Sequence, residues 1–243
     1  MSDPIYLSVV VPSYNSARIL ERNLPILLAY LKQQDYSWEV IVIEDGSNDL
    51  GETENVCRKL GCRFLNTEKN MGKGAAIRTG MKKALGSFRI FTDADIPYKP
   101  DTIGIMLRYL DLKEFQIVIG DRTLEGSSYQ CENSGLRKLP SVIFTQIVGI
   151  FFTPNLFDTQ CGLKGFRGDI ADFLFSHARL NGFAFDVELL YIALKYNFEI
   201  RRIPVRLNNH EKSTVRIIRH SVTMFFDLFK IKFNQMQGYY GEV

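Results

Sequence analysis

The chain has 243 residues, of which 46% are hydrophobic and 23% are charged, a composition typical of one globular α/β domain. Its formal net charge of +3 is too small to indicate nucleic-acid binding on its own. The four cysteines form no CxxC pair and no ligand set with the three histidines, so we expect reduced thiols in a cytosolic protein. No apolar run approaches the roughly 20 residues of a membrane-spanning helix, and the N-terminus lacks the basic region of a signal peptide.

The first half of the chain alternates between apolar runs and helical segments, which predicts a parallel sheet covered by helices on both faces. We expect strands at residues 5–13, 38–45, 62–66, 88–95 and 115–121, and helices at 16–33, 51–60, 72–85 and 101–111. Ligands of open α/β sheets bind outside the carboxyl ends of the strands. Polar residues recur at those ends, namely Asn15, Glu44, Asp45, Asp93, Asp95, Asp121 and Arg122.

After about residue 123 the alternation stops. Residues 124–135 are polar and predict a mobile loop. An apolar segment at 136–152, a dense stretch at 157–166, a helix within 182–196 and a strand at 198–205 follow. No repeat or long linker divides the chain, so we predict one domain, 1–243, with three successive segments at 1–123, 124–210 and 211–243.

The tail, residues 214–233, has helical periodicity. Between Arg201 and Lys232 there are eight Lys or Arg residues and two acids. A basic helix rich in Phe fits a membrane surface, although it also fits nucleic acid or an acidic partner, and core packing is the ordinary fate of such a stripe. One side would carry Ile218, Val222, Phe225, Phe226, Phe229 and Phe233, and the other Arg216, Arg219, His220, Asp227 and Lys230.

The sequence FTDADIPY, residues 91–98, ends an apolar run in two acids. Asp93 and Asp95 would share a face if the strand stayed extended, because alternate strand residues point the same way. Mg²⁺ or Mn²⁺ would suit these hard oxygen ligands and would bridge them to a diphosphate. A helix cap or a solvated turn is the alternative, because a lone DxD pattern is weak evidence.

Two other segments follow predicted strands. IEDGSND, residues 43–49, contains a turn and a carboxylate that would accept hydrogen bonds from a nucleobase or ribose. NMGKGAAIRTG, residues 70–80, lacks the Walker and GxGxxG spacings, so base or ribose packing is favoured over a phosphate cradle. The alternative is a simple turn with a solvated Lys73.

Taken together, VVVPSYN, IEDGSND, NMGKGAAIRTG and FTDADIPY resemble family 2 glycosyltransferases with the GT-A fold, in this order and at these separations. Downstream, DTQCGLKGF, GFAFDVELL and IPV resemble the dolichyl-phosphate glucosyltransferase branch, near the dolichyl-phosphate mannose synthases. The resemblance covers roughly residues 6–234. Departures from the pattern are Ile96, Pro97 and Tyr98 after the DAD motif, and the lack of the membrane anchors of related enzymes.

The resemblance implies roles for matching residues. Residues 1–123 would bind the nucleotide sugar, residues 124–210 the acceptor, and residues 211–243 would form the amphipathic basic helix. Asp93 and Asp95 would hold Mg²⁺ or Mn²⁺, and the catalytic group would be Asp95, Asp186 and Arg122. The nucleotide-sugar site would comprise Pro12, Tyr14, Asn15, Glu44, Asp45, Lys73 near the base, Asp93, Ala94, Asp95 and Gln160 facing the sugar. The acceptor phosphate would meet Arg122, Arg137 and Ser141.

Asp186 has two candidate roles. An alcohol loses a proton as it attacks, so a hydroxyl acceptor needs a general base, and family 2 enzymes place an Asp in this region for that purpose. A phosphate monoester is already mostly ionised near neutral pH, with a second pKa of about 6. If the acceptor is a prenyl phosphate, Asp186 would instead orient the sugar, and a helix-dipole role at a first turn is compatible with either.

The resemblance implies an inverting, metal-dependent transfer of a hexose, glucose first, from a nucleotide diphosphate sugar to a polyprenyl or dolichyl phosphate. The protein would be peripheral on the cytoplasmic face of a membrane, through residues 136–152 and 214–234, and would not bind nucleic acid. A membrane protein partner or a homo-oligomer stays open. Alternatives are transfer to a sugar hydroxyl in polysaccharide or glycolipid synthesis, GDP-mannose-dependent transfer to polyprenyl phosphate, nucleotidyl transfer, and a non-catalytic nucleotide-sugar-binding subunit.

Overall fold

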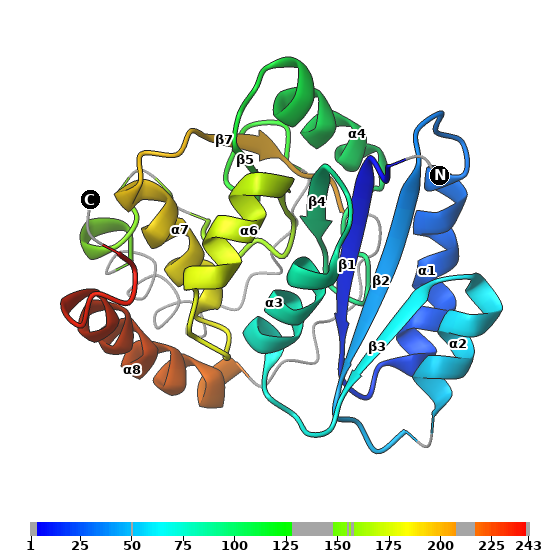
Figure 1. The fold of residues 1–243 in the computed structure, drawn as a ribbon, viewed down its shortest axis with the longest axis horizontal. Coiled ribbons are helices and arrows are strands. Elements are labelled where there is room, and N and C mark those ends of the chain that lie inside the picture. Colours follow the sequence, from blue (N-terminus) through cyan, green and yellow to red (C-terminus); the bar gives the residue numbers. More distant parts are fainter. Residues whose placement is uncertain are drawn as a thin grey trace.

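The computed structural model describes residues 4–49, 51–127, 148–154, 156, 158–207 and 217–241. Within them, a seven-stranded sheet has the order β3-β2-β1-β4-β6-β5-β7 (Figure 1). β6 is antiparallel to its neighbours β4 and β5, and the other neighbouring pairs are parallel. The predicted α/β class with a mostly parallel sheet is confirmed. The strands are β1 (Leu7–Ser13), β2 (Trp38–Asp45), β3 (Arg63–Thr67), β4 (Phe88–Phe91), β5 (Ile117–Asp121), β6 (Lys164–Arg167) and β7 (Ile200–Pro204).

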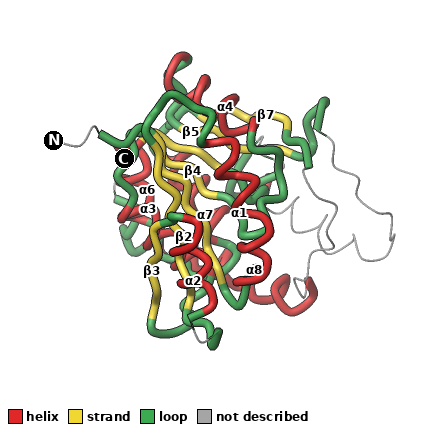
Figure 2. Tube along the Cα trace, turned by 90° about the vertical axis from the view of Figure 1, so that its right-hand side faces the viewer, coloured by secondary structure: helices red, strands yellow, loops and turns green. Residues whose placement is uncertain are grey.

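Helices cover both faces of the sheet (Figure 2). Successive strand side chains point to opposite faces, so Val10 and Ile41 join the core that packs under α3, α6, α7 and α8, whereas Val9 and Val42 join the core under α1, α2 and α4. The helices are α1 (Ala17–Leu31), α2 (Glu52–Leu60), α3 (Lys73–Lys83), α4 (Asp101–Leu107), a π-helical turn η1 (Arg108–Leu112), α6 (Gly168–His177), α7 (Phe185–Lys195) and α8 (Ile217–Met236).

Two elements, β6 and α6, were not predicted. β6 has the sequence KGFR, which shows no Val/Ile run and begins with a lysine. It nevertheless lies in the interior of the sheet, with its first three residues buried between β4 and β5. Its position therefore depends on tertiary pairing and not on local β-propensity.

The predicted extent of the fourth strand, residues 88–95, was wrong at its carboxyl end. β4 stops at Phe91, and the chain then turns, with the Ile96 N–H donating to the Asp93 carbonyl at 3.0 Å. Ile96 takes a left-handed φ of +43°, which is unusual for a β-branched residue. Asp93 and Asp95 therefore sit in a turn and do not alternate along a strand.

The helix α8 presents its aromatic residues to solvent. Leu228 and Ile231 are buried against the rest of the molecule and anchor the helix. Core packing is thus not the role of the aromatic stripe. None of the described helices is long and apolar enough to cross a membrane. The exposed large apolar side chains of the described part of α8 are Phe225, Phe226, Phe229, Phe233 and Met236, with Phe226 62% and Phe229 60% accessible.

One residue of the polar side of α8 faces the protein. Asp227, predicted on the side opposite the Phe residues, is buried. Its Oδ1 accepts a hydrogen bond from the exposed Lys230 Nζ at 2.7 Å. The side chains of Ile218, Val222, Arg219 and His220, and all of Arg216, lie outside the part of the chain that the structure describes.

Candidate active site

Four charged side chains from separate elements meet beside the carboxyl end of β4. Lys73 opens α3, Asp93 follows β4, Lys164 opens β6 and Asp186 lies in the first turn of α7. Lys73 Nζ lies 2.5 Å from Asp93 Oδ1, and Lys164 Nζ lies 2.5 Å from Asp186 Oδ1. The antiparallel pairing of β6 with β4 brings these segments together, because the first residue of β6 is opposite the last residue of β4.

The four groups are electrostatically coupled. Burial alone would lower the pKa of Lys73, but the negative charges of Asp93, Asp186 and Asp95 outweigh it, and the pKa of Lys73 is raised. Burial raises the pKa of Asp186, against the opposing pull of Lys164 and Lys73. Lys73 therefore stays cationic near the acids, which suits a site that binds a polyanionic substrate.

A glycine makes room for the first acid of the DAD turn. A Cβ atom on Gly162 would lie 2.0 Å from Asp93 Oδ2, far inside van der Waals contact. Asp93 is thus confined between the Lys73 ammonium and the Gly162 backbone. Its side chain is 33% exposed, so one side of the carboxylate stays accessible.

Glu44 and Asp45, predicted to line the nucleotide pocket, are buried at the end of β2 and bind neighbouring loops. The Met71 N–H donates to Asp45 Oδ1 at 2.9 Å, and the Gly72 N–H donates to Oδ2 at 2.7 Å. Glu44 accepts hydrogen bonds from the hydroxyls of Ser13, at 2.8 Å, and Ser47. Both carboxylates therefore fix the loops around the site, and direct contact with a nucleotide stays a prediction.

The end of β1 is more open. Pro12 is half-buried, Tyr14 is 51% exposed, and Asn15 adopts a left-handed φ of +50° while its N–H donates to Ser47 Oγ at 2.6 Å. Ala94 is half-buried within the DAD turn. An exposed tyrosine beside a strand end offers an aromatic face for a base, which is compatible with the predicted nucleotide pocket.

Arg122 is held by a carboxylate that the sequence analysis missed. Its Nε and Nη2 donate to Asp158 Oδ2 and Oδ1 at 2.8 and 2.7 Å, and its backbone N–H also donates to Oδ2 at 2.8 Å. Burial opposes the charge of Arg122, but the bonds to Asp158 raise its pKa, and these bonds also hold the pKa of Asp158 below its usual range despite burial. The pair fixes the loop after β5 against the DTQCG segment.

Gln160, expected to face the sugar, is exposed and its Nε2 lies 3.6 Å from the Met224 Sδ on α8. The structure thus places Gln160 beside α8, and it gives Gln160 no bond to the four-charge cluster of Lys73, Asp93, Lys164 and Asp186. Arg137 and Ser141, expected at the acceptor phosphate, lie outside the described residues.

The model of the family described as Glycosyl transferase family 2 matches residues 8–175. The chain belongs to glycosyl transferase family 2. It is 34% identical over 253 residues to the human dolichyl-phosphate beta-glucosyltransferase, with 96% of this chain and 76% of the relative covered. It is 32% identical over 241 residues to dolichyl-phosphate beta-glucosyltransferase ALG5D of Trichomonas vaginalis, with 93% and 73% covered.

Solved structures confirm the fold of this family 2 glycosyltransferase. Mannosyl-3-phosphoglycerate synthase from Rubrobacter xylanophilus superposes with a TM-score of 0.71 at 16% identity, covering 96% of this chain and 75% of that one. Glucosyl-3-phosphoglycerate synthase from Mycobacterium tuberculosis, in complex with Mn²⁺, UDP-glucose and phosphoglyceric acid, gives 0.69 at 18% identity, covering 93% and 79%. The predicted family and the hexosyltransferase activity class are confirmed by the family model and the relatives above.

Asp93 and Asp95 fit a divalent cation by chemistry. They are hard oxygen donors in an accessible turn, as Mg²⁺ and Mn²⁺ prefer. Among the described residues, no group of three or more His, Cys, Asp or Glu side chains is placed to hold a metal. Two carboxylates with the remaining ligands from substrate phosphates match the way Mg²⁺ is usually bound.

The sequence analysis assigned no role to three residues of this site, namely Asp158, Gly162 and Lys164. All three lie in the dense stretch FDTQCGLKGF. Composition could not separate a buried lysine from a solvated one. Only the contacts of each residue reveal its role.

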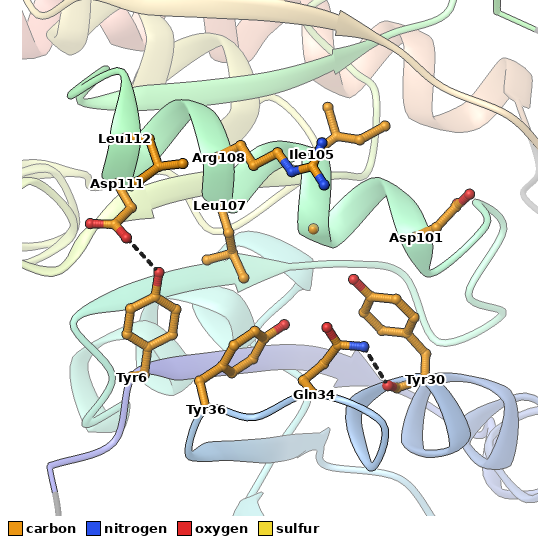
Figure 3. Close-up of a pocket in the computed structure, with 11 residues that line it drawn as sticks. Tyr6, Tyr30, Gln34, Tyr36, Asp101, Ile105, Leu107, Arg108, Asp111 and Leu112 are labelled. Carbon is orange, nitrogen blue, oxygen red and sulfur yellow. Dashed lines mark hydrogen bonds between the residues drawn. The ribbon is translucent and has the colours of Figure 1, made fainter.

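A hollow lies at the amino ends of β1 and β2, the ends away from the DAD turn. Tyr6, just before β1, and Tyr36, just before β2, line it. It measures about 470 Å³ and also takes in Tyr30 of α1 and Asp111 of η1 (Figure 3). The Tyr6 hydroxyl donates to Asp111 Oδ2 at 2.9 Å. The Tyr36 hydroxyl is buried, and within the described structure it has no hydrogen-bond partner of good geometry. This hollow is separate from the candidate active site.

Proposed function

We propose that this family 2 glycosyltransferase carries a hexose, with glucose as the first choice, from a nucleotide diphosphate sugar to a polyprenyl or dolichyl phosphate. The observation that carries the proposal is the likeness to dolichyl-phosphate beta-glucosyltransferases at 29–34% identity over 93–99% of the chain. UDP-glucose is the expected donor, and GDP-mannose is the second.

In the proposed reaction, a phosphate oxygen of the lipid attacks the anomeric carbon from the face opposite the leaving group. A new carbon–oxygen bond forms as the bond to the nucleoside diphosphate breaks, and the configuration inverts. The acceptor oxygen is already ionised near neutral pH, so no proton has to be removed. The site must then position two anions against each other, and Lys73, whose side chain is 20% exposed, provides a positive charge for this task.

Asp93 and Asp95 would hold Mg²⁺ or Mn²⁺ together with the donor diphosphate. When bound, the ion would neutralise the charge that develops on the leaving diphosphate. Lys73 would stabilise the same charge from α3. Arg122 would lie at the mouth of the site, where its pairing with Asp158 holds the guanidinium in place for an acceptor phosphate. Asp186 would orient the sugar.

The exposed aromatic face of α8 supports a place on a membrane. Phe225, Phe226, Phe229 and Phe233 are all exposed, and Lys230 and Lys232 lie on the same helix. Aromatic residues next to basic ones favour the interface of an anionic membrane. We therefore place the enzyme peripherally on the cytoplasmic face, where a long lipid phosphate would be presented to it.

The test is a transfer assay with purified protein. UDP-glucose, UDP-galactose, UDP-N-acetylglucosamine or GDP-mannose would be supplied with Mg²⁺ or Mn²⁺, with and without a short polyprenyl phosphate. Released nucleoside diphosphate and lipid-linked sugar would both be measured. An Asp95→Ala variant should lose transfer, and Asp169→Ala, which changes an exposed acid in the first turn of α6, serves as the matched control.

Lipid-dependent release from one donor, lost only in Asp95→Ala, would establish the reaction and name the sugar. Transfer to a sugar hydroxyl, with turnover abolished by Asp186→Asn, would instead support the hydroxyl-acceptor alternative. Donor binding without transfer to the lipid would refute the prenyl-phosphate acceptor.

A further inference from the structure

The buried lysine of β6 is the strongest feature that the proposed reaction leaves unused. Lys164 has no exposed surface, and its ammonium donates to the Cys161 carbonyl at 2.7 Å and to Asp186 Oδ1 at 2.5 Å. It also lies 5.4 Å from the centroid of the Phe91 ring. A buried ammonium is costly unless it is paired and hydrogen-bonded, and Lys164 meets both conditions through contacts that also fix its direction.

These contacts decide where Asp186 points. Asp186 is the second residue of α7 and lies 22 residues after Lys164, whose ammonium donates to its Oδ1. The charged groups that face it are Lys164 from β6, Lys73 from α3 and Asp93 after β4. Of these, Lys164 bonds directly to Oδ1, so the orientation of the carboxylate follows from the position of a residue locked in the sheet.

We propose that Lys164 is a positioning residue for the donor sugar: it fixes the Asp186 carboxyl group beside Lys73 and Asp93, with Oδ1 occupied and the other oxygen left to accept a sugar hydroxyl. The proposal rests on the proposed function for its substrate class, a nucleotide diphosphate hexose. The nucleoside diphosphate itself needs no contact with Asp186. Lys164 should therefore affect the affinity for the sugar and not for the nucleotide.

The test compares the binding of UDP-glucose with the binding of UDP by calorimetry, in the presence of Mn²⁺. In Lys164→Met we expect the affinity for UDP-glucose to fall at least about tenfold, the scale of one charge-assisted hydrogen bond, and the affinity for UDP to change less than about threefold. Asp186→Asn should give the same pattern. Lys164→Arg, which keeps the charge, should retain part of the preference for UDP-glucose.

The pH dependence separates positioning from a structural role. Without the Lys164 charge, Asp186 would take up a proton at a higher pH than in the wild type, because the cation that opposes protonation is gone. The UDP-glucose affinity of Lys164→Met should therefore recover in part as the pH is raised. Asp186→Asn has no carboxyl group to titrate and should show no such recovery.

If Lys164→Met does not fold, the Lys164→Met/Asp186→Asn double variant carries the test, because it buries no unpaired charge. It should fold and bind UDP-glucose as weakly as Asp186→Asn. Equal losses for UDP and UDP-glucose, a double variant with wild-type affinity, or a wild type that binds UDP-glucose no better than UDP would overturn the proposal. Failure of transfer to prenyl phosphate would refute the proposed function and leave this binding comparison intact.

Discussion

Replacing two exposed aromatic residues of α8 should detach the protein from membranes. Phe226 and Phe229 are 62% and 60% exposed. Burial of a whole Phe side chain contributes about 1.5–3 kcal/mol of free energy. Transfer of the exposed part of each ring into the membrane interface should therefore contribute about 1–2 kcal/mol to binding. The pair thus supplies about 3 kcal/mol, and its loss should weaken vesicle binding on the order of 100-fold, since about 1.4 kcal/mol is tenfold.

The assay is sedimentation with vesicles of phosphatidylcholine and phosphatidylserine, comparing the wild type with Phe226→Ser/Phe229→Ser. The matched control is Ile105→Ser/Leu112→Ser. These residues are 42% and 73% exposed, but they lie on α4 and η1, away from α8. The control lowers total surface hydrophobicity by a similar amount. It should nevertheless bind vesicles like the wild type, because the aromatic face of α8 stays intact.

The reasoning is refuted if the wild type does not bind the vesicles, or if both double variants lose affinity equally. The first outcome would mean that the exposed face serves another purpose, such as a protein partner. The second would mean that binding follows overall hydrophobicity and not the geometry of α8.

Three further outcomes follow from the hydrogen bonding of Asp158, Tyr36 and Tyr6. Asp158→Asn should destabilise the protein by about 3 kcal/mol, because the largely buried Arg122 loses its anion; urea unfolding measures this, and an unchanged midpoint would contradict it. The folded state also holds the pKa of Asp158 low, so its stabilisation is present above about pH 4 and is lost as the pH falls through the folded-state pKa; Asp158→Asn should flatten this acid limb of the stability curve. Tyr36→Phe should leave the melting temperature unchanged or raise it, since the hydroxyl it removes is buried without a good partner, whereas Tyr6→Phe, which loses a hydrogen bond to a carboxylate, should lower it.

The first half of the fold was predictable because its signals are local. β1 and β2 are continuous runs of Val and Ile, and the helices between strands bury one side each. The second half was less predictable because its central strand is short and begins with a lysine. Lys164 is acceptable inside the sheet because its ammonium pairs with Asp186, 22 residues further along the chain, and donates to the Cys161 carbonyl. No window of sequence contains both partners at helical or strand spacing.

The acids at the strand ends were also only partly predictable: the sequence gives their positions, but only the folded structure shows what their oxygens bind. The rule that ligands bind at the carboxyl ends of strands singled out Asp93, which lies in the charged cluster. The same rule also singled out Asp45 and Asp121, whose carboxylates bind protein groups: backbone N–H groups of the loop before α3 in one case, and Thr123 and Arg202 in the other. Carboxylates at strand ends can thus serve two tasks, holding the loops that surround a ligand or meeting the ligand itself. Sequence position alone does not separate these tasks, because both need an acid at the same edge of the sheet, and the difference lies in whether protein groups hold both of its carboxylate oxygens.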